Sequence, residues 1–330
     1  MVGVASQSRS FEGESGAGYD NFNIVNDGEL QFTVTTVLDN GVKISTDVEI
    51  NVSQADSSLL DASNIHFYTK FGTFYTGTTF GPIFVLGTQI SPPGAVNALN
   101  CDFGDWIVRP TGSNSVSSTF CGATVPASNK NMKAAYVSNM IYDTLAFGVG
   151  YTPSTTNTDA PPAVGGDDGT ETQQYEASFV FLPKLGPWQL RSDVGIWQNQ
   201  GTETNSYYGI RGGVDISLRG LGFVATAAKI KPNAPGVLGT SNSQEEESYS
   251  LGANYSTDSY SIGIAYLKNE QPRSSSVAGS DTIDKIFLGL SVPVGPSVEF
   301  LASLFHVRLE DEGGLSNSGA AFVTGINVGF

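Results

Sequence analysis

The sequence is poor in basic residues and contains no long apolar run. Only 16 Lys and Arg stand against 32 Asp and Glu in 330 residues, which gives a formal net charge of −16. Nucleic-acid binding needs a concentrated basic surface, so a nucleic-acid-binding protein is excluded. An acidic protein attracts cations and cationic solutes instead. No apolar stretch approaches the ~20 residues of a membrane-spanning helix, which excludes a helical membrane protein.

Histidine and cysteine are also scarce. His66 and His306 are the only histidines, so neither a Ser/His/Asp arrangement nor a His-rich metal set can be assembled, and an enzyme is not expected. Cys101 and Cys121 lie in one long loop-like segment without a CxxC motif. A disulfide in an oxidising compartment is predicted, with two reduced cysteines as the alternative.

Acidic runs are the only candidates for a bound ion. Asp167, Asp168 and Glu171 form one run, and Glu245 to Glu247 form another, but neither has the EF-hand spacing. We expect solvated external acids, no cofactor and no dedicated metal site. Loosely bound Ca²⁺ at these loops is the one cofactor left open.

The residues that are abundant favour strands and turns. The chain has 39 Gly, 13 Tyr and 19 Phe, a mixture poor in helix formers. Segments of about ten residues alternate apolar with polar or small residues, which is typical of the strands of a transmembrane barrel. In "YGIRGGVDISL", Ile210, Val214 and Ile216 oppose Arg211 and Asp215. A soluble sandwich would alternate too, so alternation alone does not decide.

The lengths of the connections distinguish the two folds. Tight turns such as "DNG" at residues 39–41 alternate with long stretches such as 80–130, 153–170 and 269–280. This sorting predicts a barrel with all short periplasmic turns at one end and all long external loops at the other. About sixteen strands are counted, so residues 1–330 are predicted to form a single all-β, antiparallel up-and-down transmembrane barrel with an aqueous channel.

Two stretches and the last strand resemble a known family. "NDGELQFTVTTVLDNGVKISTDVEI" and "NIHFYTKFGTFYTGTTFGP" are similar to the early strands of Gram-negative general porins, especially those of alphaproteobacteria, and the alternating end "GAAFVTGINVGF" is similar to their last strand. The resemblance implies a trimeric outer-membrane barrel for small hydrophilic solutes, with the third loop, residues 80–130, folded into the lumen. It also implies that Phe330 belongs to the signal read by the barrel-assembly machinery, and that outer-membrane lipid and lipopolysaccharide surround the barrel. An exported precursor would have lost its signal peptide before residue 1.

The alternation along the strands, which we call parity, puts charged side chains on the face opposite the apolar one. This face is predicted to line the channel, because charges facing lipid near the midplane would cost a few kcal/mol each. We hypothesise that basic wall residues face Asp102 and Asp105 of the third loop and create a transverse field. The alternative is that most are neutralised neighbours on a solvated wall. The candidate lining and constriction residues are Asp102, Asp105, Lys43, Lys70, Lys133, Arg191, Arg211, Lys285, Asp47 and Glu49. Parity also places Glu29, Glu176, Asp193 and Asp215 on the inner face.

The function predicted from these features is passive diffusion of small hydrophilic solutes and ions, with mild cation selectivity from the overall acidity. A substrate-selective channel for sugars or oligosaccharides is the first alternative, and a run of aromatic side chains along the lumen would favour it. A soluble β-rich adhesin or lectin is the second.

Overall fold

The computed structural model describes residues 2–11, 22–26, 28–52, 60–90, 92–94, 131–153, 173–200, 206–232, 245–274, 277–310 and 316–329. Within these ranges the chain is almost entirely β-strand, with one short helix, α1 (Pro82–Leu86). Among the described residues, no helix is long and apolar enough to cross a membrane. The strands are β1 (Val2–Phe11), β2 (Phe22–Asn26), β3 (Glu29–Val37), β4 (Lys43–Asn51), β5 (Leu60–Thr69), β6 (Gly72–Thr79), β7 (Asn131–Ser138), β8 (Leu145–Thr152), β9 (Gln173–Phe181), β10 (Lys184–Leu185), β11 (Trp188–Gln200), β12 (Tyr207–Leu218), β13 (Leu221–Pro232), β14 (Glu246–Ser256), β15 (Ser261–Ser274), β16 (Val277–Gly295), β17 (Val298–Glu310) and β18 (Ser316–Val328).

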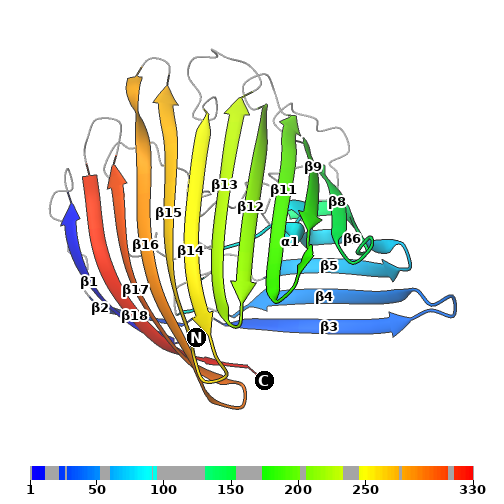
Figure 1. Ribbon diagram of the computed structural model, residues 1–330, viewed down its shortest axis with the longest axis horizontal. Coiled ribbons are helices and arrows are strands. Elements are labelled where there is room, and N and C mark those ends of the chain that lie inside the picture. Colours follow the sequence, from blue (N-terminus) through cyan, green and yellow to red (C-terminus); the bar gives the residue numbers. More distant parts are fainter. Residues whose placement is uncertain are drawn as a thin grey trace.

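These eighteen segments form sixteen antiparallel up-and-down strands in one sheet. β2 and β3 follow one another along the chain and pair with β1 and β4 respectively, while β10 continues the pairing of β9 along β11. The pairing also joins the last strand to the first, with Val2 opposite Ile326 and Phe11 opposite Asn317. Figure 1 shows β11 to β18 side by side as one tall wall. The predicted fold class and strand number are confirmed.

One predicted connection is wrong. The stretch from residue 269 to residue 280 was expected to be a long loop. Instead β15 continues to Ser274 and β16 begins at Val277, with a register shift between Pro272 and Ser274. Within sheets, prolines are confined to edges and bulges, and Pro272 lies directly before this register shift.

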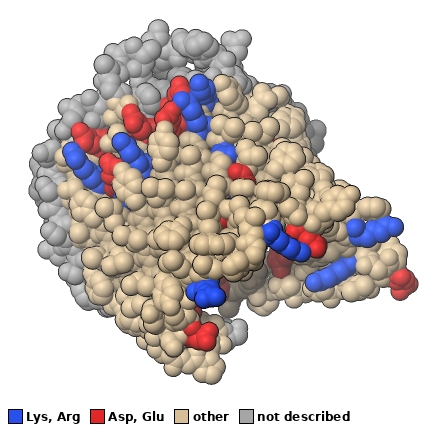
Figure 2. Space-filling view, in the orientation of Figure 1, with Lys and Arg blue, Asp and Glu red and all other residues tan. Residues whose placement is uncertain are grey.

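The two faces of the wall differ as the sequence parity predicts. On β12, Ile210 is 50% exposed while Arg211 on the opposite face is 2% exposed. The exposed apolar side chains lie on the outer face, and Figure 2 shows this broad face as mostly uncharged, with charged side chains gathered in its upper left part and on the lower right. Surface ion pairs include Lys229 near the end of β13 with Glu245, and Arg308 near the end of β17 with Glu310.

Aromatic side chains lie near the strand ends on the outer face. Trp188, Tyr208, Tyr255 and Tyr260 are all 40–46% exposed. Tyr142 differs, because it lies in the turn between β7 and β8 and is 95% exposed.

Candidate functional site

The segment that follows β6 lies against the inner face of the wall. It contains α1, which contacts β7, β8, β9 and β11 and appears beside β9 and β11 in Figure 1. Pro82 in the first turn lacks an N–H that would otherwise need a partner, and Gly81 and Gly87 flank the helix. We call the described residues 80–90 and 92–94 the inner segment.

Two carboxylates of the wall hold backbone N–H groups of the inner segment. Ile83 N donates to Glu176 Oε2 on β9 at 3.2 Å, and Thr88 N donates to Asp193 Oδ1 on β11 at 2.6 Å. Both carboxylates are buried, so these charge-assisted bonds compensate part of the cost of removing them from water. They fix the two ends of the helical turn on the wall.

Two arginines hold the carbonyl groups at the end of the same turn. Arg191 Nη2 donates to Leu86 O at 2.6 Å, and the guanidinium of Arg211 donates to Thr88 O. Arg211 Nη2 also lies 3.5 Å from Asp193 Oδ2, and both side chains are at most 1% exposed. The last carbonyls of a helix have no partner within it, so these guanidinium groups satisfy acceptors that would otherwise be orphaned.

Lys133 adds a second buried pair next to the start of the helix. Its Nζ lies 4.0 Å from Glu176 Oε1, and both side chains are 1% exposed. The inner segment is therefore held by buried groups of both signs.

Glycines on the inner face give the segment room. A Cβ at Gly148 would lie 2.6 Å from Pro82, one at Gly213 would lie 2.7 Å from Thr88 Cβ, and one at Gly263 would lie 2.8 Å from Pro93. Such distances are shorter than real Cβ contacts, so a larger residue would displace the segment. We call these positions the glycine path, and its members are Gly148, Gly150, Gly195, Gly213, Gly252, Gly263 and Gly289. The path leads from β8 to β16.

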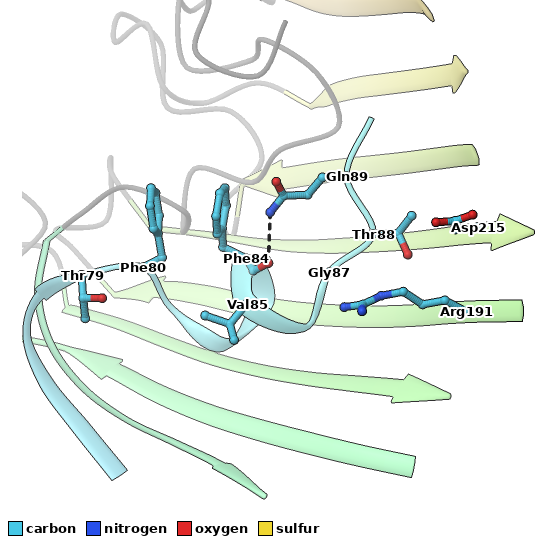
Figure 3. Close-up of a pocket in the computed structure, with 9 residues that line it drawn as sticks. All are labelled: Thr79, Phe80, Phe84, Val85, Gly87, Thr88, Gln89, Arg191 and Asp215. Carbon is cyan, nitrogen blue, oxygen red and sulfur yellow. Dashed lines mark hydrogen bonds between the residues drawn. The ribbon is translucent and has the colours of Figure 1, made fainter. Parts of the chain in front are cut away.

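A pocket of about 440 Å³ opens between the inner segment and the wall. Figure 3 shows Phe80 and Phe84 side by side at one end, and their ring centroids are 3.9 Å apart. Arg191 and Asp215, which are opposite one another on β11 and β12, lie at the other end. The pocket thus offers an aromatic side and a side with both charges. The lining residues are Thr79, Phe80, Phe84, Val85, Gly87, Thr88, Gln89, Arg191 and Asp215.

A separate acidic group lies on β3, β4 and the bulge in β5. Carboxylate oxygens of Glu29, Glu49 and Asp61 lie within 4.8 Å of one another. The register shift between Glu49 and Ile50 places Asp61 beside them. Parity placed Glu29 and Glu49 on the inner face, whereas Asp61 was not among the predicted inward residues, because alternation does not reveal the bulge in β5.

The structure brings together only some of the predicted lining residues. Arg191, Arg211 and Lys133 meet at the inner segment, as described above. Lys285 is fully buried on β16. Lys43 lies over the ring of Tyr68 at 5.0 Å, whereas Lys70 lies over Phe71 in the turn after β5 and not on a strand.

The predicted acids have different surroundings. Asp47 accepts a hydrogen bond from Thr33 Oγ1 at 2.6 Å, and Glu49 belongs to the acidic group. Asp102, Asp105, Phe330 and the predicted disulfide between Cys101 and Cys121 lie outside the described residues, as does most of the predicted constriction loop. The disulfide therefore has no support from the structure.

Sequence reasoning missed the anchoring roles of Glu176 and Asp193 and the glycine path. It placed both acids on the inner face by parity, yet parity does not say which backbone group a carboxylate meets. Glycine recurring at inward positions was the available signal for a close approach of another segment.

Comparison with known proteins gives a family match and several similar structures. A family model described as Gram-negative porin matches residues 1–318. No curated protein matches the chain. The anion-selective porin from Comamonas acidovorans is 15% identical with a TM-score of 0.63, over 99% of this chain and 97% of that chain.

Two further structures have the same fold. The outer membrane channel DcaP of Acinetobacter baumannii is 10% identical with a TM-score of 0.61, over 99% of this chain and 95% of that chain. The trimer form of in-vitro folded OmpT of Vibrio cholerae is 12% identical with a TM-score of 0.59, over 98% and 96%. At these identities the likeness shows the fold alone.

Proposed function

This chain belongs to the Gram-negative porin family, and on that premise we propose that it forms a water-filled channel for passive diffusion of small hydrophilic solutes, with mild selectivity for cations. It is an outer-membrane channel protein. In such a channel, selectivity follows from pore width and from the charges along the wall. No covalent chemistry is required.

The observation that carries the cation preference is the distribution of wall charges. Arg211 is buried, Arg191 is half-buried, and both donate to carbonyl groups of the inner segment, so part of their charge is taken up there and does not face the water-filled space. The acidic group of Glu29, Glu49 and Asp61 instead concentrates negative charge on one inner surface, where it attracts cations. The Comamonas porin shares the fold and is anion-selective, so selectivity depends on such local groups rather than on the barrel.

The proposal includes a homotrimer in the outer membrane, embedded in lipid and lipopolysaccharide. Its support is the trimer form of OmpT, which has the same fold. Three independent pores in one complex would open in groups of three in a planar bilayer.

Reconstitution in planar bilayers tests the function directly. We expect stepwise conductance, and a reversal potential in a KCl gradient that favours K⁺. The preference should weaken towards 1 M salt, because the Debye length falls from ~10 Å at 0.1 M to ~3 Å. Absence of conductance would remove the channel assignment, and a reversal potential favouring anions would remove the cation preference.

A variant links the preference to the acidic group. Glu29→Gln, Glu49→Gln and Asp61→Asn together should shift the reversal potential towards zero. The matched comparison is Glu49→Gln alone against Glu310→Gln, because each removes one charge and Glu310 lies at the end of β17 in a surface pair with Arg308. An equal shift in the control would mean that total charge, and not the acidic group, sets the preference.

A further inference from the structure

The pocket between the inner segment and the wall has two opposite charges at its wall end. Arg191 on β11 is opposite Asp215 on β12 in the register, so the two side chains leave the same face of the sheet as neighbours. Both are half-buried, and both line the pocket of about 440 Å³. A cationic and an anionic side chain therefore border the same space.

The two charges are not bonded to each other. The guanidinium of Arg191 points towards the end of α1 in Figure 3, where Nη2 donates to Leu86 O at 2.6 Å. Within the described part of the chain, the Asp215 carboxylate has no hydrogen-bond or ion-pair partner. A guanidinium has five N–H donors, and Leu86 O is the acceptor that the described residues give to this one. Both groups therefore keep capacity for a further partner of opposite charge.

The other end of the pocket is apolar. Phe80 and Phe84 lie there with their rings stacked, so each covers one face of the other. Both side chains are nevertheless only half-buried, and Val85 in the same lining is 49% exposed. The uncovered parts of these three side chains form an apolar surface that a solute can contact. The pocket volume lies within the range of sites for small molecules.

We propose that this pocket binds zwitterionic α-amino acids with an apolar side chain on their way through the channel. The carboxylate of such a solute accepts from Arg191, and its ammonium donates to Asp215. Its side chain lies against the apolar end of the pocket.

The charge pattern favours this class of solute over others. An anion is repelled by Asp215 and a cation by Arg191, whereas a zwitterion matches both groups. In an α-amino acid the two charged groups are attached to one carbon atom, which suits two wall charges on neighbouring strands. This inference rests on the proposed function, because the solute must enter through an open channel.

The test is a ligand-observed NMR titration of the detergent-solubilised protein with three probes that share one aromatic side chain. Phenylalanine carries both charges, N-acetylphenylalanine keeps only the carboxylate, and phenylalanine amide keeps only the ammonium. We expect saturable binding of phenylalanine, and binding about threefold to tenfold weaker for each singly charged probe.

A variant separates the charge of Asp215 from the shape of the pocket. Asp215→Asn should weaken phenylalanine binding about threefold to tenfold, because the ammonium loses its partner. It should not weaken the binding of N-acetylphenylalanine, which has no ammonium. A pocket that had merely collapsed would lose both probes alike.

Glu299→Gln is the matched control. This acid shares its face with the buried Ser303 at the start of β17, a strand that is not adjacent to β12, so the variant removes one charge from the inner face away from the pocket. It should bind phenylalanine as the wild type does.

The outcomes separate this inference from the proposed function. Conductance without saturable phenylalanine binding would overturn the inference and leave the channel. A singly charged probe that binds as tightly as phenylalanine, or an equal loss of both probes in Asp215→Asn, would also overturn it. Saturable binding with the expected order of probes in a protein without conductance would support the binding site and overturn the channel.

Discussion

The glycine path gives the sharpest test of how the inner segment is positioned. Gly213 and Gly212 are neighbours on β12, but a Cβ at Gly213 would lie 2.6 Å from Asp193 Oδ1 and 2.7 Å from Thr88 Cβ. A Cβ at Gly212 would meet only Asp193 O, at 3.5 Å. Neither glycine has a positive φ, so alanine fits the backbone at both positions.

The magnitude follows from these distances. Ordinary contact begins at 3.4 Å, so Gly213→Ala requires Thr88 to move by about 0.7 Å, which is 3.4 minus 2.7. The same residue is fixed through its N–H by Asp193 and through its carbonyl by Arg211, so it cannot move without straining both bonds. Overpacking of this kind typically costs ~1–3 kcal/mol.

We expect Gly213→Ala to lower the single-channel conductance and the unfolding temperature in detergent, because the inner segment moves away from β12 towards the lumen. Gly212→Ala should leave both quantities at wild-type values. If the two variants behave alike in both assays, the inner segment is not positioned by contact with the glycine path, and the reasoning fails.

Three further predictions concern the buried pair of Arg211 and Asp193, the terminal Phe330, and the two cysteines. Arg211→Gln should destabilise the fold by roughly 3–5 kcal/mol, because it leaves Asp193 as a buried charge without its ion pair; Arg211→Met with Asp193→Leu should cost less, and thermal unfolding compares the two. Phe330→Ala should reduce the amount of trimer assembled in the outer membrane while leaving the conductance of each assembled pore unchanged, as quantitative immunoblots and bilayer recordings would reveal. If Cys101 and Cys121 are bonded, the protein alkylated after reduction should be heavier by two alkyl groups than the protein alkylated without reduction, as measured by mass spectrometry. Equal masses would favour two thiols.

The sequence was sufficient for the barrel because strand periodicity and loop length are local properties. Alternation on β12 places Ile210 and Ile216 on one face and Arg211 on the other. The apolar face must be the one that faces lipid, and this holds for each strand independently of the others. Parity likewise placed Lys133, Glu176 and Asp193 on the inner face. The connection lengths were less reliable, because the long loop predicted at residues 269–280 is occupied by the continuing strands β15 and β16.

The tertiary structure decided which inward residues meet. Glu176 and Asp193 are separated from Ile83 and Thr88 by 93 and 105 residues, so their hydrogen bonds depend on where the inner segment crosses the sheet. Arg191 and Arg211 bind carbonyl groups of the inner segment, which no sequence pattern indicated, while the transverse field towards Asp102 and Asp105 stays a prediction. Periodicity fixes the face on which a side chain lies, whereas its partner depends on the path of a segment distant in sequence, and that path is set by the packing of the whole barrel.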